Sequence, residues 1–162
     1  DDIERCHEQR PVDAIQTGLS LIDYLDDRDL IAWCGERQIA GTIYEPLASG
    51  ILTDRPFDQV YERWMGTAWE DSPFVERLFS PGKAERSKRV VEGLREIADD
   101  VDATVAQVAI GWVLRQPGVI AAIAGSTDPD RARSNAAGGD VDLSDVRWKA
   151  VDDLIPLGPA FA

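Results

Sequence analysis

The sequence predicts an α/β fold in which parallel strands alternate with covering helices. Short apolar, β-branched runs alternate with amphipathic helical runs along the chain, and glycine or Asp-Pro pairs mark several junctions. The 162 residues are 44% hydrophobic, which is enough for one packed core. We therefore expect a single domain over residues 1–162 with a parallel sheet. Ligands of such sheets bind at the carboxyl ends of the strands.

The first part of the chain contains two predicted strands separated by one helix. Residues 12–20, "VDAIQTGLS", are predicted as a strand with its exit loop, and residues 29–40 as a helix. Gly41 follows that helix and is predicted to stop it. Residues 41–46, "GTIYEP", form the second predicted strand.

Residues 53–83 show neither a helical nor a strand period and carry half of the aromatic residues of the chain. A structureless segment of this length in a compact domain is usually functional. We therefore expect a long loop that acts as a lid or cofactor belt, with Trp64, Trp69 and Phe74 as candidate contacts. The alternative is that these aromatic side chains only pack locally.

Helices dominate the region after this loop. Residues 87–100 have apolar side chains at helical spacing. A second helix is predicted to start at Thr104, because Thr104 and Gln107 fit a capping box. A last helix is predicted to begin near Ser144.

A third strand is predicted over residues 118–127, and it leads directly into a helix. Asp128 has the character of an N-cap, and the Gly-Ser-Thr turn at 125–127 precedes the helix N-terminus. Backbone N–H groups at such a terminus favour anions, and Arg131 could add a two-pronged donor. Asp130 and Asp128 count against a dense anion. The alternative is a capped surface helix with a solvated arginine.

Gln16 and Tyr44 are each predicted to end a strand. A tyrosine there could offer its ring as a flat stacking surface, and a glutamine could pair with a carboxamide. The alternatives are a half-buried strand tyrosine and a buried amide that has found its own partners.

The composition excludes several kinds of partner. A net charge of −13 and a pI near 4.4 argue against nucleic acid and against anionic membranes. No apolar run approaches the length of a membrane span, and Cys6 and Cys34 are too isolated for a zinc site. His7 lacks triad partners. We expect reduced cysteines, with one disulfide between them as the alternative, a cytoplasmic location and no metal.

Several segments together resemble the aldo-keto reductase family. The first strand, ending in "AIQ", is similar to the sixth barrel strand of that family, and "IAWCGERQIAGTIYEPLASGILT" to its next helix and seventh strand. The stretch "LREIADDVDATVAQVAIGWVLRQPGVIAAIAGST" resembles its seventh helix and eighth strand. The following "DPDRARSNAA" resembles its cofactor-clamping helix.

The resemblance implies the C-terminal half of a (β/α)8 barrel that binds NADP(H). Gln16 would contact the nicotinamide carboxamide, and Tyr44 would stack on the nicotinamide ring. The remaining residues implied in cofactor binding line the pyrophosphate (Leu47, Ala48 and Ser49) or hold the adenosine 2′-phosphate and adenine (Gly125, Ser126, Arg131 and Asn135).

The chain departs from the family pattern at several points, and one of them is the Asp54-Arg55 pair, which stands where many relatives have Gly-Lys. Glu45 stands where the motif has serine, and Gly125 stands where some members have lysine. The catalytic tetrad of the family belongs to strands that precede this segment. A complete barrel takes about 250 residues, so only three of eight strands are expected here.

Two functions remain open at this point. The first is an NADP(H)-dependent reductase of aldehydes or ketones, acting in its complete form on a small carbonyl substrate. The alternative is a non-enzymatic NADP(H)-binding or regulatory module on the same scaffold. A half barrel would expose strand edges, so self-association is a further expectation.

Overall fold

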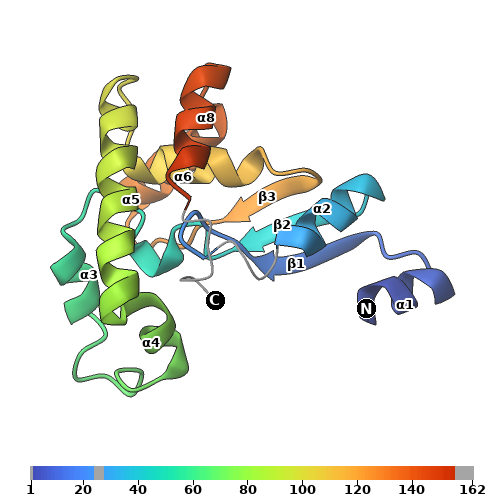
Figure 1. Ribbon diagram of the computed structural model, residues 1–162, viewed down its shortest axis with the longest axis horizontal. Coiled ribbons are helices and arrows are strands. Elements are labelled where there is room, and N and C mark those ends of the chain that lie inside the picture. Colours follow the sequence, from blue (N-terminus) through green and yellow to red (C-terminus); the bar gives the residue numbers. More distant parts are fainter. Residues whose placement is uncertain (1, 24–27, 156–162) are drawn as a thin grey trace.

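A three-stranded parallel sheet forms the centre of the protein. The computed structural model describes residues 2–23 and 28–155, and its strands are β1 (Ala14–Gly18), β2 (Ala40–Tyr44) and β3 (Val119–Ile123). They lie in the order β1-β2-β3, so β2 is central (Figure 1). Gly18 pairs with Tyr44, and Tyr44 pairs with Ile123. The carboxyl ends of all three strands therefore meet at one edge.

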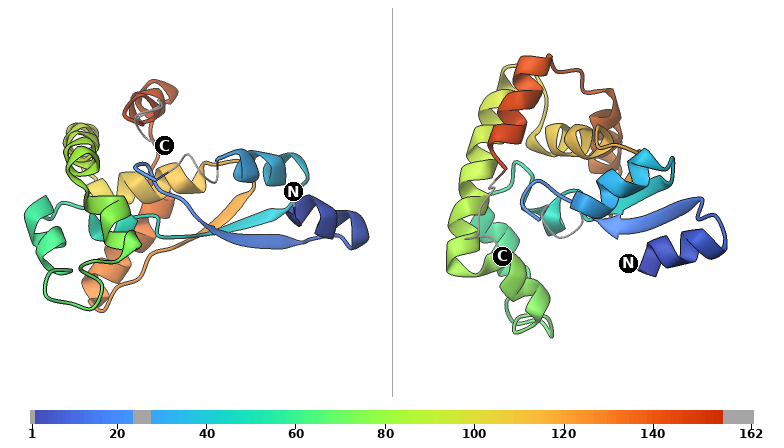
Figure 2. Two further views of the ribbon diagram at one scale, coloured as in Figure 1. Left: turned by 60° about the horizontal axis from the view of Figure 1, so that its bottom comes forward. Right: turned by 45° about the vertical axis from the view of Figure 1, so that its right-hand side comes forward.

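Helices connect the strands and cover one face of the sheet. In Figure 2, α2 and α6 lie on the same side of the sheet, and α5 and α8 lie farther out. The helices are α1 (Asp2–Gln9), α2 (Arg28–Glu36), α3 (Phe57–Glu62), α4 (Pro73–Phe79), α5 (Pro81–Asp99), α6 (Val105–Leu114), α7 (Pro129–Ala136) and α8 (Asp145–Asp153), with 3-10 turns η1 (Ala48–Gly50) and η2 (Ala137–Asp140). Among the described residues, no helix is long and apolar enough to cross a bilayer. The parallel α/β architecture predicted from the sequence is confirmed.

The core lies between the sheet and the helices, and the other sheet face is open. Ile43 of β2 and Trp112 of α6 are fully buried in one apolar cluster. By contrast, Ile123 of β3, which pairs with Tyr44 on the other face, is 47% exposed. Ile120, which has no partner at the register shift in β3, is 66% exposed. Apolar side chains on a sheet face normally need a covering layer. The described residues supply that layer on one face only.

The predicted helix caps are confirmed. The Thr104 Oγ1 accepts the backbone N–H of Gln107 at 3.1 Å, and the Gln107 Oε1 accepts that of Thr104 at 2.9 Å. Asp128 caps α7, with Pro129 at its first position. These caps are local in sequence, which is why composition and spacing suffice to predict them.

Two predicted boundaries are wrong. Helix α2 ends at Glu36 because Gln38 adopts a left-handed backbone conformation with φ of 57°, and Gly41 lies inside β2 instead of stopping a helix. Gln16 does not end its strand, because β1 continues to Gly18. Hydrogen bonding across the sheet thus carries β1 two residues past Gln16, and it starts β2 at Ala40, one residue before the predicted start, while β2 ends at Tyr44.

Residues 53–83 are not a structureless loop. They contain α3, α4 and the first residues of α5. Helix α4 begins with Ser72, whose Oγ accepts the N–H of Val75 at 3.2 Å. The role of this segment as a lid or cofactor belt stays a prediction.

Candidate functional site

Tyr44 stands at the carboxyl end of the central strand with its ring beside β1. Its side chain is 47% exposed. A Cβ atom added at Gly18 would lie 2.9 Å from Tyr44 Cε2, so the ring packs directly over the backbone of that glycine. A residue with any side chain at position 18 would displace the ring. The half-exposed aromatic ring is thus supported by β1 on one side.

Gln16 lies on the same sheet face as Tyr44, two residues before the end of β1. It pairs in register with Thr42, and Gly18 pairs with Tyr44. Side chains paired across neighbouring strands share a face, as do residues two apart in one strand. The Gln16 side chain is exposed. The sheet therefore brings these two predicted cofactor contacts to one open surface.

The turn after β2, residues 45–50, has a strained backbone. Positive φ angles occur at Glu45 (55°), Ala48 (44°), Ser49 (57°) and Gly50 (94°). Glycine adopts such angles freely, but each of the other three residues destabilises the fold by about 1 kcal/mol relative to a right-handed conformation. Backbone hydrogen bonds hold the turn, including those from Gly50 N and Leu52 N to the Leu47 carbonyl oxygen.

The three residues predicted to line a pyrophosphate present different groups in this turn. The Ala48 side chain is buried, so only its backbone can face a ligand. Leu47 is partly buried and packs against the core, and Ser49 is partly exposed. The Ala48 N–H already donates to the Glu45 carbonyl oxygen at 2.9 Å, and the Gly50 N–H donates to that of Leu47 at 2.9 Å, so a ligand at this turn meets two N–H groups that already have partners.

Glu45 forms a contact that the sequence did not predict. Its Oε2 accepts a bond from Arg77 Nη2 at 3.3 Å, and Arg77 Nη1 also donates to Asp23 Oδ2. Burial raises the pKa of Glu45, and a hydrogen bond from Ser49 Oγ at 3.4 Å acts in the opposite direction. Burial also lowers the pKa of Arg77. We call Asp23, Arg77 and Glu45 the strand-end clamp.

The candidate anion site at the start of α7 is already satisfied by its own aspartate. Asp128 Oδ1 accepts the N–H groups of Asp130 at 2.9 Å and Arg131 at 3.3 Å, and Oδ2 accepts Arg131 Nε at 2.9 Å. Ser126 Oγ accepts the Asp128 N–H at 3.1 Å and donates to the Asp128 carbonyl oxygen at 3.0 Å. A phosphate binding here would have to share Arg131 with Asp128.

Gly125 and Asn135 flank that group. A Cβ added at Gly125 meets nothing within 4 Å, and the residue has no positive φ. Asn135 lies one turn after Arg131 on α7 and is partly buried. Position 125 therefore has room for a long side chain that could reach the same site.

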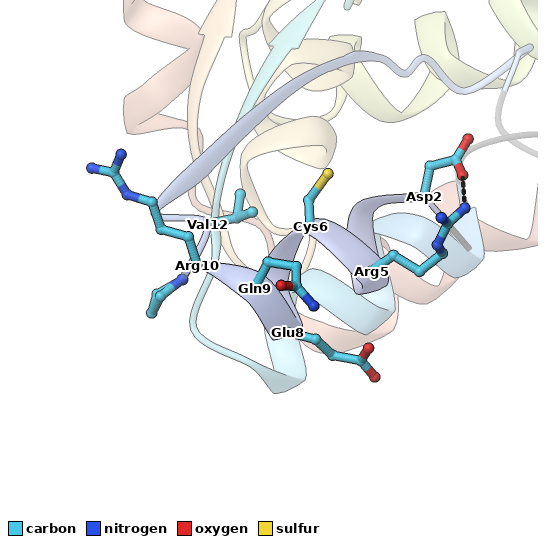
Figure 3. Close-up of a pocket in the computed structure, with 8 residues that line it drawn as sticks. Asp2, Arg5, Cys6, Glu8, Gln9, Arg10 and Val12 are labelled. Carbon is cyan, nitrogen blue, oxygen red and sulfur yellow. Dashed lines mark hydrogen bonds and ion pairs between the residues drawn. The ribbon is translucent and has the colours of Figure 1, made fainter.

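A separate pocket lies far from these strand ends. It has a volume of about 790 Å³ and lies between α1 and the residues leading into β1, lined by Arg5, Cys6 and Val12 among others (Figure 3). It sits at the amino end of β1, and α1 contributes no buried residue.

The described cysteines and acidic residues form no cluster of metal ligands. Within the part of the chain that the structure describes, no group of three or more His, Cys, Asp or Glu side chains could hold a metal ion. Cys6 is exposed and Cys34 is buried, and both are free, as predicted. Burial raises the pKa of the Cys34 thiol, which makes it a poor nucleophile.

These features define a parallel α/β protein whose candidate site lies at the carboxyl ends of its strands. More particularly, the chain belongs to the aldo/keto reductase family, whose model matches residues 1–156. The resemblance inferred from the sequence is therefore confirmed.

Individual relatives agree with this assignment. The chain is 26% identical over 158 residues to an NADH-specific methylglyoxal reductase of Escherichia coli, covering 90% of this chain and 43% of the relative. It is 33% identical over 159 residues to an aldo-keto reductase of Gibberella moniliformis, covering 93% and 46%. The chain thus spans less than half the length of these relatives.

A solved structure confirms the fold class. The glycerol dehydrogenase from Gluconobacter oxydans superimposes with a TM-score of 0.75 at 23% identity, covering 97% of this chain and 48% of that one. The three parallel strands and their helices are accordingly part of a (β/α)8 barrel.

Proposed function

We propose that this chain forms the cofactor-binding part of an NADP(H)-dependent reductase that converts aldehydes or ketones to alcohols. The observation that carries the proposal is the arrangement at the strand ends. Tyr44 on the central strand is half exposed over Gly18, Gln16 shares its face, and the 45–50 turn and the start of α7 follow the neighbouring strand ends. This surface suits a long, flat, charged ligand.

The residues present fit a nicotinamide cofactor in most respects. The Tyr44 ring would support the nicotinamide, the Gln16 amide would pair with its carboxamide, and Asn135 would meet the adenine. The turn at Leu47, Ala48 and Ser49 would line the pyrophosphate. When bound, the cofactor supplies a hydride to the carbonyl carbon. The proton donor is proposed to lie on strands outside this chain, and no catalytic residue is assigned within it.

The choice between NADP(H) and NAD(H) depends on the groups that would surround the 2′-phosphate. Ser126 and Arg131 suit a 2′-phosphate, whereas the Asp128 carboxylate already holds Arg131. One relative is named as NADH-specific. We propose NADP(H) as the cofactor, with a discrimination against NAD(H) that Asp128 reduces.

The test measures cofactor binding and turnover in the protein as its gene encodes it. Quenching of tryptophan fluorescence should report NADPH binding, and loss of NADPH absorbance with a panel of aldehydes and ketones should report turnover. Tyr44→Leu should weaken binding about tenfold, because a stacked ring contributes roughly 1–3 kcal/mol. Tyr44→Phe keeps the ring and should bind almost as the wild type does.

The outcomes separate the two functions that the sequence left open. Binding with turnover supports the reductase. Binding without turnover of any carbonyl compound favours the non-enzymatic module. If neither cofactor binds, or if Tyr44→Leu binds as tightly as Tyr44→Phe, the proposal fails.

We also propose that the open sheet face and the edges of β1 and β3 are covered by further strands, or by self-association when those are absent. Ile120 and Ile123 would then become buried. Light scattering of the 162-residue chain should show association or a poorly folded species. A monomer that unfolds cooperatively would refute this proposal.

A further inference from the structure

We propose that Arg77 is a positioning residue of the candidate site. Through Asp23 and Glu45 it ties α4 to the carboxyl ends of β1 and β2, and it thereby holds the 45–50 turn in the strained conformation that receives the cofactor. The effect on cofactor binding rests on the proposed function, whereas the docking of α4 does not.

The Asp23 side of the clamp is fixed by a tight turn just after β1. Ser20 and Asp23 exchange backbone hydrogen bonds at 3.2 and 3.3 Å, and the Asp23 N–H also donates to Ser20 Oγ at 3.2 Å. Ser20 is 1% exposed. The carboxylate that receives Arg77 is therefore carried by a backbone that is anchored in the protein.

The Glu45 side lies directly after Tyr44. Glu45 is the first left-handed residue of the strained turn, and its Oε1 also accepts the Ser49 hydroxyl. The Glu45 carboxylate thus links Arg77 to Ser49, and it connects the two ends of the turn. Losing the guanidinium would leave this carboxylate uncompensated two residues before the proposed pyrophosphate contacts.

Helix α4, which carries Arg77, is anchored in the apolar core. Val75, Leu78 and Phe79 of the helix are buried in the core cluster. The Arg77 guanidinium also lies 5.6 Å from the centre of the Phe74 ring. The helix is therefore held by apolar contacts, and Arg77 determines how its polar side meets the strand ends.

The charges in the clamp indicate a role in geometry more than in stability. The three side chains are only 28–37% exposed. Removing such charges from water offsets most of their attraction, so a partly buried ion pair often fixes an arrangement with little net gain in stability. Arginine suits this task because its planar fork can engage two carboxylates at once.

The test compares Arg77→Met with Arg77→Lys in the protein as its gene encodes it. Arg89→Met serves as the matched control, since Arg89 is an exposed arginine on the adjacent α5. Hydrogen exchange read by mass spectrometry, without cofactor, reports on α4 and on residues 45–50. Steady-state kinetics report KM for the cofactor separately from kcat.

In Arg77→Met we expect exchange in both segments to rise at least about fivefold and the cofactor KM to rise about tenfold, with kcat largely kept. Arg77→Lys should recover part of both effects, and Arg89→Met should change neither. In a protein that already carries Glu45→Gln, Arg77→Met should raise hydrogen exchange and the cofactor KM by a smaller factor, because the two residues act together.

Unchanged exchange in Arg77→Met overturns the proposal, as does a rise in KM that is equal with and without Glu45→Gln. Faster exchange with an unchanged cofactor KM overturns the positioning role. Faster exchange in a protein whose wild type binds no cofactor upholds the docking of α4 and contradicts the proposed function instead.

Discussion

Asp128→Asn should increase the preference for NADPH over NADH. The Asp128 carboxylate both caps α7 and holds the Arg131 guanidinium at 2.9 Å. Asparagine is as good an N-cap as aspartate, so the helix should keep its start. The substitution therefore removes a negative charge from the proposed 2′-phosphate site and releases Arg131 without removing the cap.

The magnitude follows from Coulomb's law for a 2′-phosphate charge taken to lie about 5 Å from the Asp128 carboxylate. A unit charge about 5 Å from another repels it by about 0.8 kcal/mol in water and by about 3 kcal/mol at the effective dielectric of a protein surface. The Asp128 side chain is 38% exposed, which places the effect in the lower part of this range. We expect about 1.4 kcal/mol, or a tenfold rise in the ratio of NADH to NADPH dissociation constants.

The assay titrates each variant with both cofactors at two salt concentrations. Asp130→Asn is the matched control, because Asp130 is almost fully exposed and pairs with Arg133 at 2.7 Å. It should change the ratio less than about twofold, as expected for an exposed charge. High salt should reduce the effect of Asp128→Asn. A ratio that stays at its wild-type value, or an equal gain for both cofactors, would refute the reasoning.

Three further predictions follow from the same surface. Gly125→Lys should tighten NADPH binding several-fold and leave NADH unchanged, since its side chain enters open space beside Ser126; equal gains for both cofactors in titrations would contradict this. Gly18→Ala should weaken cofactor binding about as much as Tyr44→Leu does, because its Cβ would lie 2.9 Å from the Tyr44 ring; binding at the wild-type level would show that the ring has another support. Burial raises the pKa of Glu45 above its ordinary 4.5, so the stability linked to its protonated form is present below that value and is lost as the pH rises through the raised pKa. The free energy of unfolding of the wild type relative to Glu45→Gln, measured with denaturant, should therefore fall as the pH rises, and a constant difference would count against this.

The sequence predicted those features whose cause is local. The capping box of Thr104 and the cap of Asp128 each depend on residues three positions apart, and both are present. Helix α4 carried the same kind of signal, with Ser72 followed by Pro73, but its seven residues are too short to show a period. Short helices of this kind are stabilised by tertiary packing, which no local pattern reveals.

The strand-end clamp could not be predicted for a different reason. Arg77 lies 54 residues from Asp23 and 32 from Glu45, so only the fold brings them together. Glu45 departs from the family motif, so the sequence marked this one member of the contact as unusual. Without its partner, it could only be read as an unexplained negative charge beside a cofactor.

Substitutions of the two acidic residues near the proposed cofactor, Asp128 and Glu45, should therefore have different structural consequences. Asp128 makes its contacts within its own turn and helix, so a single substitution there can change the charge that a ligand meets while the fold stays the same. Glu45 shares Arg77 with Asp23 and bonds Ser49, so any change there also alters α4 and the strained turn. We infer that cofactor preference can be adjusted at the end of β3 independently of the architecture. At the end of β2, by contrast, the geometry of the turn and the local charge can only change together.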